Sequence, residues 1–195
     1  MLNDRSTPLS LLKTRRSGKP REMAAPGPAR DQLLEMIEIA ARTPDHGKLF
    51  PWRFVVVPDE ARDVLAARLG EILGAEKADW NDRDVEAAGE FARQAPALVV
   101  LLSSPIHGHK IPVWEQELSA GAVAMNLLHA AHAMGFVGGW ITGWAAYSPG
   151  VTALFAREGE RIAGFLFIGT PTRPLEERPR PILSEIVHFW GGRGG

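Results

Sequence analysis

A chain of 195 residues, of which 45% are hydrophobic and 23% charged, can bury the core of one globular domain, and we treat residues 1–195 as a single domain. The formal net charge of −1 provides no basic field, which argues against nucleic acid or an anionic membrane surface as a partner. Cysteine is absent, which excludes disulfide bonds, cysteine metal sites and a cysteine nucleophile, and is consistent with a cytoplasmic protein.

The first half of the chain alternates helical and extended patterns. Thr7 and Pro8 form a helix start, with a capping hydroxyl and a proline at the first helical position. Apolar residues at helical spacing predict further helices, whereas short apolar runs predict buried strands. The expected helices cover 8–14, 31–42 and 60–74, a polar and helical stretch covers 75–94, and the strands cover 52–57 and 97–103.

The second half of the chain contains a long uncharged stretch. No Asp, Glu, Lys or Arg occurs from Leu118 to Ala156, but glycines, prolines and polar residues interrupt it too often for a membrane span. We expect a helix over 114–134, a strand over 136–142, a short helix over 148–156, a strand over 161–169 and an extended, proline-rich tail. A helix that is apolar all round lies in a large core or an interface, which indicates that two subunits share one core.

These elements predict an α+β fold, in which a mixed β-sheet is flanked by helices on both faces and the chain forms a homodimer with a shared core. The glycines do not form the GxGxxG pattern after a first strand, so a dinucleotide-binding Rossmann unit is not supported. A Walker-type glycine loop is also absent from the sequence.

Two short stretches carry the chemistry of the first half. Arg15, Arg16 and Ser17 offer two guanidinium groups and a hydroxyl, a set that suits a phosphate, although a basic pair is more often a solvated surface. The loop from Pro44 to Trp52 lies between a helix and a strand, where it can present polar groups to a ligand. Together they suggest a phosphorylated cofactor.

Other clusters have structural explanations of equal or greater weight. His46 with His107 and His109 could hold a metal ion, but the spacing provides no convergent carboxylate, so surface histidines are the better interpretation. Because no Ser-His-Asp set or carboxylate pair stands out, an enzymatic reaction would depend on a cofactor. The glycines 138 and 139 before Trp140 allow close backbone approach by a ligand.

Six stretches in this order resemble the nitroreductase family of FMN-dependent oxidoreductases, and more narrowly a compact bacterial subgroup of it. The resemblance covers about residues 9–190. Its stretches are Arg15–Ser17, the loop from Pro44 to Trp52, the helix start from Trp114 to Gly121, the segment 135–140, the late strand 164–171 and the ending 180–188.

The resemblance also implies positions for a flavin. It places Arg15, Arg16, Ser17 and Arg180 at the phosphate, with Lys19 a weaker candidate. It places His46 and Phe50 beside the flavin ring or ribityl chain. It places Trp140, Ile141 and Thr142 against the isoalloxazine. Many relatives carry glutamine where this chain has Phe50, which lacks a side-chain donor.

The function that the resemblance implies is electron transfer from NAD(P)H to a nitroaromatic, quinone or similar acceptor. The expected cofactor is bound FMN, the expected reductant is NAD(P)H, and the expected mechanism is ping-pong in a cytoplasmic homodimer with no metal. An alternative is a flavin-binding protein without significant turnover. A third reading, a metal-dependent hydrolase built on the histidines, predicts bound metal and no flavin.

Overall fold

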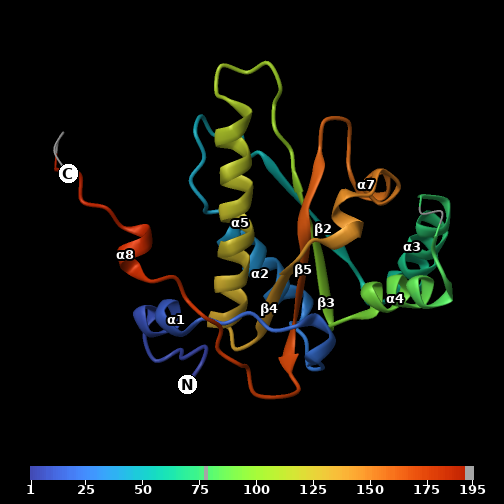
Figure 1. The fold of residues 1–195 in the computed structure, drawn as a ribbon, viewed down its shortest axis with the longest axis horizontal. Coiled ribbons are helices and arrows are strands. Elements are labelled where there is room, and N and C mark those ends of the chain that lie inside the picture. The colour runs from blue at the N-terminus through green and yellow to red at the C-terminus, as the bar shows by residue number, and fades with distance from the viewer. Residues whose placement is uncertain (77–78, 192–195) are drawn as a thin grey trace.

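A computed structural model describes residues 1–76 and 79–191 as a β-sheet between two layers of helices (Figure 1). The strands found in the described residues are β1 (Met23–Ala24), β2 (Trp52–Val57), β3 (Ala97–Ser103), β4 (Val137–Ile141) and β5 (Arg161–Pro171). Their order is β1-β5-β3-β2, and β4 also pairs with β5. The expected α+β class is confirmed.

All pairings between the described strands are antiparallel, whereas we expected a mixed sheet. Both β3 and β4 pair with β5 over residues 165–168, so they lie on opposite sides of it and run in the same direction. Helix α5 (Val113–Ala133) makes the crossover between these two strands. Strands β3 and β4, which α5 connects, therefore run parallel to each other. Because β5 lies between them, every neighbouring pair in the sheet is antiparallel.

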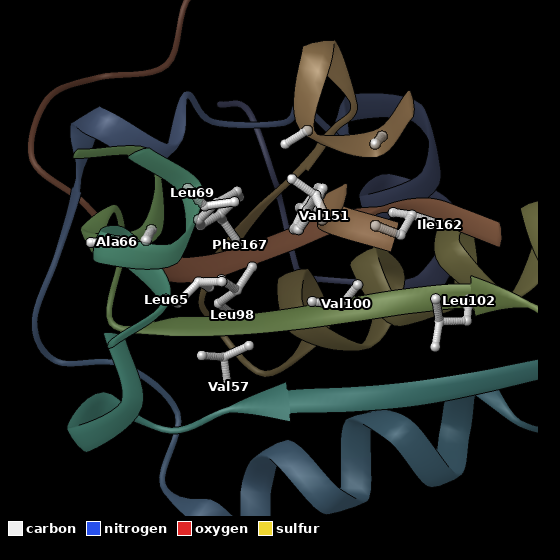
Figure 2. Packing of buried hydrophobic residues seen from close by; sticks show 14 of the residues in the cluster. Val57, Leu65, Ala66, Leu69, Leu98, Val100, Leu102, Val151, Ile162 and Phe167 are labelled. Carbon is white, nitrogen blue, oxygen red and sulfur yellow. The ribbon is translucent and has the colours of Figure 1, made fainter. Parts of the chain in front are cut away.

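Strand β3 is buried on both faces, and its alternation divides the core in two. Leu98, Val100 and Leu102 point to one face, where they pack with Phe167 and with Leu69 of helix α3 (Figure 2). Val99 and the other odd-numbered residues point to the opposite face, where helix α5 packs.

The helices on the first face are α3 (Arg62–Glu76), α4 (Asp82–Arg93), α6 (Gly143–Tyr147) and α7 (Pro149–Phe155). The opposite face is covered by α5 and by α2 (Arg30–Ala40), while α1 (Pro8–Thr14) lies near the C-terminal end of α5 (Figure 1). The short helix α8 (Leu183–Ile186) follows the sheet and projects away from it (Figure 1). None of the described helices combines the length and apolarity that a membrane crossing requires.

Most predicted elements are confirmed, and two details are wrong. Helix 8–14, with Thr7 as its cap, and strands 52–57 and 97–103 have the expected bounds. The predicted burial of 52–57 is wrong, because β2 pairs only with β3 and is partly exposed. The predicted helical character of 75–94 is confirmed by the end of α3 and by the separate helix α4, while residues 77 and 78 of this stretch lie outside the described residues. The uncharged stretch contains the additional helix α6, which was not predicted. The tail is extended apart from α8. Two short 3-10 turns lie in the first half of the chain, at Pro20–Glu22 and Asp59–Ala61.

Helix α5 is only half buried within one chain, although its composition predicted burial all round. Val123 and Leu127 are fully buried against the sheet. Trp114 and Leu118, on another side of the helix, are 66% and 52% exposed. An apolar helix face that one chain leaves in water is the feature expected of a core shared by two subunits.

Candidate functional site

Arginine side chains meet near the end of α1. Arg15 directly follows α1, and the Arg180 guanidinium donates to the Arg15 carbonyl at 3.4 Å, from 165 residues away in the chain. Burial and the guanidinium groups of Arg180 and Arg16 lower the pKa of the Arg15 side chain, and Arg178 adds to this effect. No ion pair within the described residues involves Arg15, so this half-buried cluster carries positive charge that an anion can neutralise.

The other predicted cationic residues are occupied by the protein itself. The Arg16 guanidinium donates to the Glu176 carbonyl at 2.7 Å and to the Ser17 carbonyl at 2.9 Å, so it fastens the late chain to the early one. Lys19 lies 3.3 Å from the Glu22 carboxylate. Arg15 makes one side-chain hydrogen bond, to the Ser17 hydroxyl at 3.3 Å, which leaves it more donors for a ligand than Arg16 has.

The arginine segment is joined to β4 through glycines. The Gly18 amide donates to the Gly138 carbonyl at 3.1 Å. A Cβ on Gly139 would lie 2.7 Å from the Gly18 carbonyl oxygen. Within the chain, Gly139 therefore admits the Gly18 carbonyl and Gly138 admits the Leu128 side chain, and the approach of a ligand to these glycines stays a prediction.

Strand β4 carries the residues predicted to face a flavin ring, but it presents them on opposite sides. The Trp140 indole donates to the Ala163 carbonyl at 3.0 Å and reaches toward Gly121 of α5. Ile141 points to the other face and packs with the α3 and α7 core. Thr142 follows as the residue before α6. One planar ligand can therefore contact the Trp140 ring, whereas it would meet Ile141 and Thr142 through their backbone.

The loop from Pro44 is fixed against the N-terminal end of α5. The Asp45 carboxylate accepts from the backbone amides of Leu49 and Phe50, at 2.5 and 3.0 Å. The His46 ring nitrogen Nδ1 lies 2.8 Å from the Glu115 carboxylate. Phe50 is 62% exposed and has a φ of 49°, a left-handed conformation that is uncommon for a bulky residue.

The predicted residues are thus spread along α5 and do not form one cluster. Arg15 influences His129, near the C-terminal end of α5, while Trp140 lies at the level of Gly121 and His46 contacts Glu115 at the start. Fourteen residues separate Glu115 from His129, which corresponds to about 21 Å of helix. The structure joins Arg15, Ser17 and Arg180 to β4, but it leaves the His46 loop at the far end.

Helix α5 carries two histidines three residues apart, His129 and His132. His132 is fully buried, and its Nε2 accepts from the Gly138 amide at 3.2 Å. Burial lowers its pKa to about 4, with the positive charge of Arg15 as a further cause. His132 is therefore neutral at pH 7 and supports the strand below the arginine cluster.

A metal centre has no support in residues 1–76 and 79–191, where no three His, Asp or Glu side chains gather in a way that could hold an ion. His109 accepts from the Ile111 amide instead. Sequence spacing provided no convergent carboxylate for His46, so Glu115 was missed as its partner. The sequence interpretation also missed Glu177, which pairs with Arg180 at 2.7 Å and comes from the tail that was described only as extended.

Comparison with known proteins decides the family. The model of the nitroreductase family matches residues 12–170. YdjA of Escherichia coli (strain K12), which is named as an NAD(P)H nitroreductase, is 38% identical over 164 residues, or 84% of this chain and 87% of YdjA. The chain belongs to the nitroreductase family.

Solved structures agree with this family at the level of the fold. A nitroreductase-like family protein from Bacillus cereus has a TM-score of 0.80 at 21% identity, covering 96% of this chain and 97% of that protein. The FMN and NADPH-dependent nitroreductase NfnB from Sphigopyxis sp. strain HMH has a TM-score of 0.72 at 21% identity, covering 95% and 99%.

The residues of this nitroreductase-family chain fit an FMN molecule in two respects. A half-buried arginine cluster with surplus positive charge suits a phosphate. From Gly138, which is bonded to the arginine segment, to Ile141 is three strand residues, or about 10 Å. A phosphate at Arg15 and a ring at Trp140 can therefore belong to one elongated molecule that lies along β4.

Proposed function

We propose that this chain is an FMN-dependent, NAD(P)H-oxidising oxidoreductase of nitroreductase type that acts on nitroaromatic, quinone or similar acceptors. The observation that carries the proposal is the arginine cluster, in which Arg15, Arg16, Arg178 and Arg180 outnumber the single carboxylate of Glu177, and which is joined by Gly18 to the strand of Trp140. The names of YdjA and NfnB support the reductant and the flavin.

In the proposed site, each side chain has a binding or orienting task. Arg15, Arg180 and Ser17 would hold the phosphate, and Arg16 would keep the tail with Arg180 in place. Trp140 would limit the position of the ring, with the backbone of Ile141 and Thr142 beside it. When bound, FMN supplies the hydride chemistry, taking electrons from NAD(P)H and passing them to an acceptor that enters after the nicotinamide leaves.

The proposed active unit is a cytoplasmic homodimer of single-domain chains. Trp114 and Leu118 leave an apolar face of α5 in water, and the tail leaves further large apolar side chains exposed, Phe189 and Trp190 among them at more than 90%. If two α5 helices pair about a two-fold axis and run antiparallel, the start of one approaches the end of the other. The His46 loop of a second copy would then approach the ligand that Arg15 holds.

The decisive experiment is the visible absorption spectrum of the purified protein after reconstitution with FMN, before and after anaerobic NADPH addition. We expect flavin bands that NADPH bleaches and that an added quinone restores. Bands that persist with both NADH and NADPH would support the alternative, a flavin-binding protein without significant turnover. A protein that retains no flavin would overturn the proposal.

A further inference from the structure

A cavity lies behind β4, on the face of the sheet away from α5. It measures about 410 Å³ and is bounded by α3, α4 and the segment from β4 into α6. Its walls include Leu69 and Leu73 from α3, Ala88 and Phe91 from α4, and Trp144 from α6. The volume is within the range of small-molecule sites, and none of the arginines of the anion cluster lines it.

The cavity exists because α4 places small side chains where larger ones would fill the space. Ala87 and Ala88 line it, and the buried residues of α4 are only Gly89 and Ala92. Phe91, in contrast, is held in place by edge-on contacts with Phe165 and Phe167, at centroid distances of 5.1 and 5.2 Å. The core therefore fixes the Phe91 ring as one wall of the cavity, while the small side chains of Ala87 and Ala88 leave the space beside it unfilled.

The lining also defines the chemistry of an occupant. Aromatic rings on two different elements, Phe91 and Trp144, favour an aromatic ligand through stacked or edge-on contacts. No described lining residue is basic, and one, Asp84, is acidic, with its carboxylate accepting from the Asn81 amide at 3.1 Å. A carboxylate or sulfonate buried there would therefore find no cation among the lining residues and would face a like charge. A molecule with one or two aromatic rings and no negative charge meets both conditions.

We propose that this cavity, behind Ile141 and between α3, α4 and Trp144, is a binding site for an uncharged aromatic molecule. Because Ile141 and Thr142 form one side of the cavity and also border the proposed flavin site, an occupant would lie directly behind the strand end that faces the ring. The assignment depends on the shape and lining of the cavity, and it does not require that the chain bind FMN.

The test uses 6-fluoro-2-naphthol as the probe, followed by ¹⁹F NMR on the full-length protein with and without FMN. We expect saturable binding with one site per chain, and at least about tenfold weaker binding of the anionic 6-fluoro-2-naphthoate. Ala88→Phe should abolish binding by filling the cavity. Ala67→Phe is the matched control, because Ala67 is an exposed α3 residue outside the lining.

Ala87→Phe provides a second blocking variant at an exposed lining position, for use if Ala88→Phe does not fold. Binding that is not saturable, equal binding of naphthol and naphthoate, or undiminished binding in a folded blocking variant would overturn the inference. FMN affinity is measured in the same samples. Naphthol binding without FMN binding would reject the proposed function alone, and the reverse result would reject this cavity alone.

Discussion

The two ends of α5 lie beside side chains of different chemistry. At its C-terminal end, Arg15 and Arg180 gather positive charge above the fully buried His132. At its N-terminal end, the exposed His46 pairs with a carboxylate and the Phe50 ring lies in solvent. One end is equipped to hold an anion within a single chain, whereas the other presents a rigid loop outward. The family resemblance implied that both groups of residues contact one flavin, and a single chain does not bring them together.

The strongest challenge to this comparison is to prevent two chains from pairing. Leu118→Arg places a charge on the exposed apolar face of α5, so we expect loss of the dimer and a fall in FMN affinity of at least about tenfold. Sedimentation velocity and FMN titration measure both effects. Val64→Arg, on the exposed side of α3, is the control and should remain dimeric. A Leu118→Arg protein that is still a dimer would show that this face is not the interface.

Acid titration tests the buried histidine at the C-terminal end of α5. The pKa of His132 is about 4 in the folded protein, whereas its ordinary value, taken for the unfolded chain, is 6.5. Between these two pH values the unfolded chain therefore binds more protons than the folded protein. Stability from this group is complete above pH 6.5 and falls as the pH drops toward 4, by about 3 kcal/mol in total.

His132→Gln keeps an acceptor for the Gly138 amide but does not titrate, so urea denaturation from pH 7 to 4 should show a flatter pH dependence. Leu34→Gln, at an exposed α2 position, is the control, because it adds the same amide without removing a titratable group, and its curve should keep the shape of that of the unchanged protein. Parallel curves for His132→Gln and the unchanged protein would contradict the assignment.

Removal of one guanidinium tests the anion end directly. Arg15→Ala should raise the Kd for FMN about 10- to 100-fold, because a hydrogen bond to a charged group contributes about 1.5–3 kcal/mol. Titration of the apoprotein measures the change. Arg21→Ala removes an exposed arginine from the 3-10 turn and should bind FMN normally. Equal FMN affinity in the Arg15 and Arg21 variants would show that this cluster does not hold the phosphate.

The smallest effect on stability is expected at the outward loop. Phe50→Gln changes an exposed side chain, so the free energy of unfolding should shift by less than about 0.5 kcal/mol. The new amide can donate a hydrogen bond to a bound flavin, so the reduction potential should change while the melting curve does not. Leu34→Gln, at an exposed α2 position, controls for the change in polarity and should leave the potential unaltered. An unaltered potential in Phe50→Gln would place the loop away from the ring.

The sequence was sufficient where local physics decides the structure. Thr7 with Pro8, and the unbroken apolar run of β3, identify their elements because capping geometry and double-sided burial depend on nearby residues. The insertion of β5 between β3 and β4 could not be predicted, since strand order depends on residues distant in the chain. The same applies to the site, where Arg180 reaches Arg15 across 165 positions.

The hydrogen bond from the Gly18 amide to the Gly138 carbonyl joins the arginine segment to β4. Any side chain at 139 would have to push the Gly18 carbonyl away, and the arginine segment would move with it. The segment proposed to hold the anion is therefore bonded directly to the strand that carries Trp140. In hydrogen-exchange terms, the Gly18 amide should open together with β4, at the rate of the sheet and not at the rate of a surface loop.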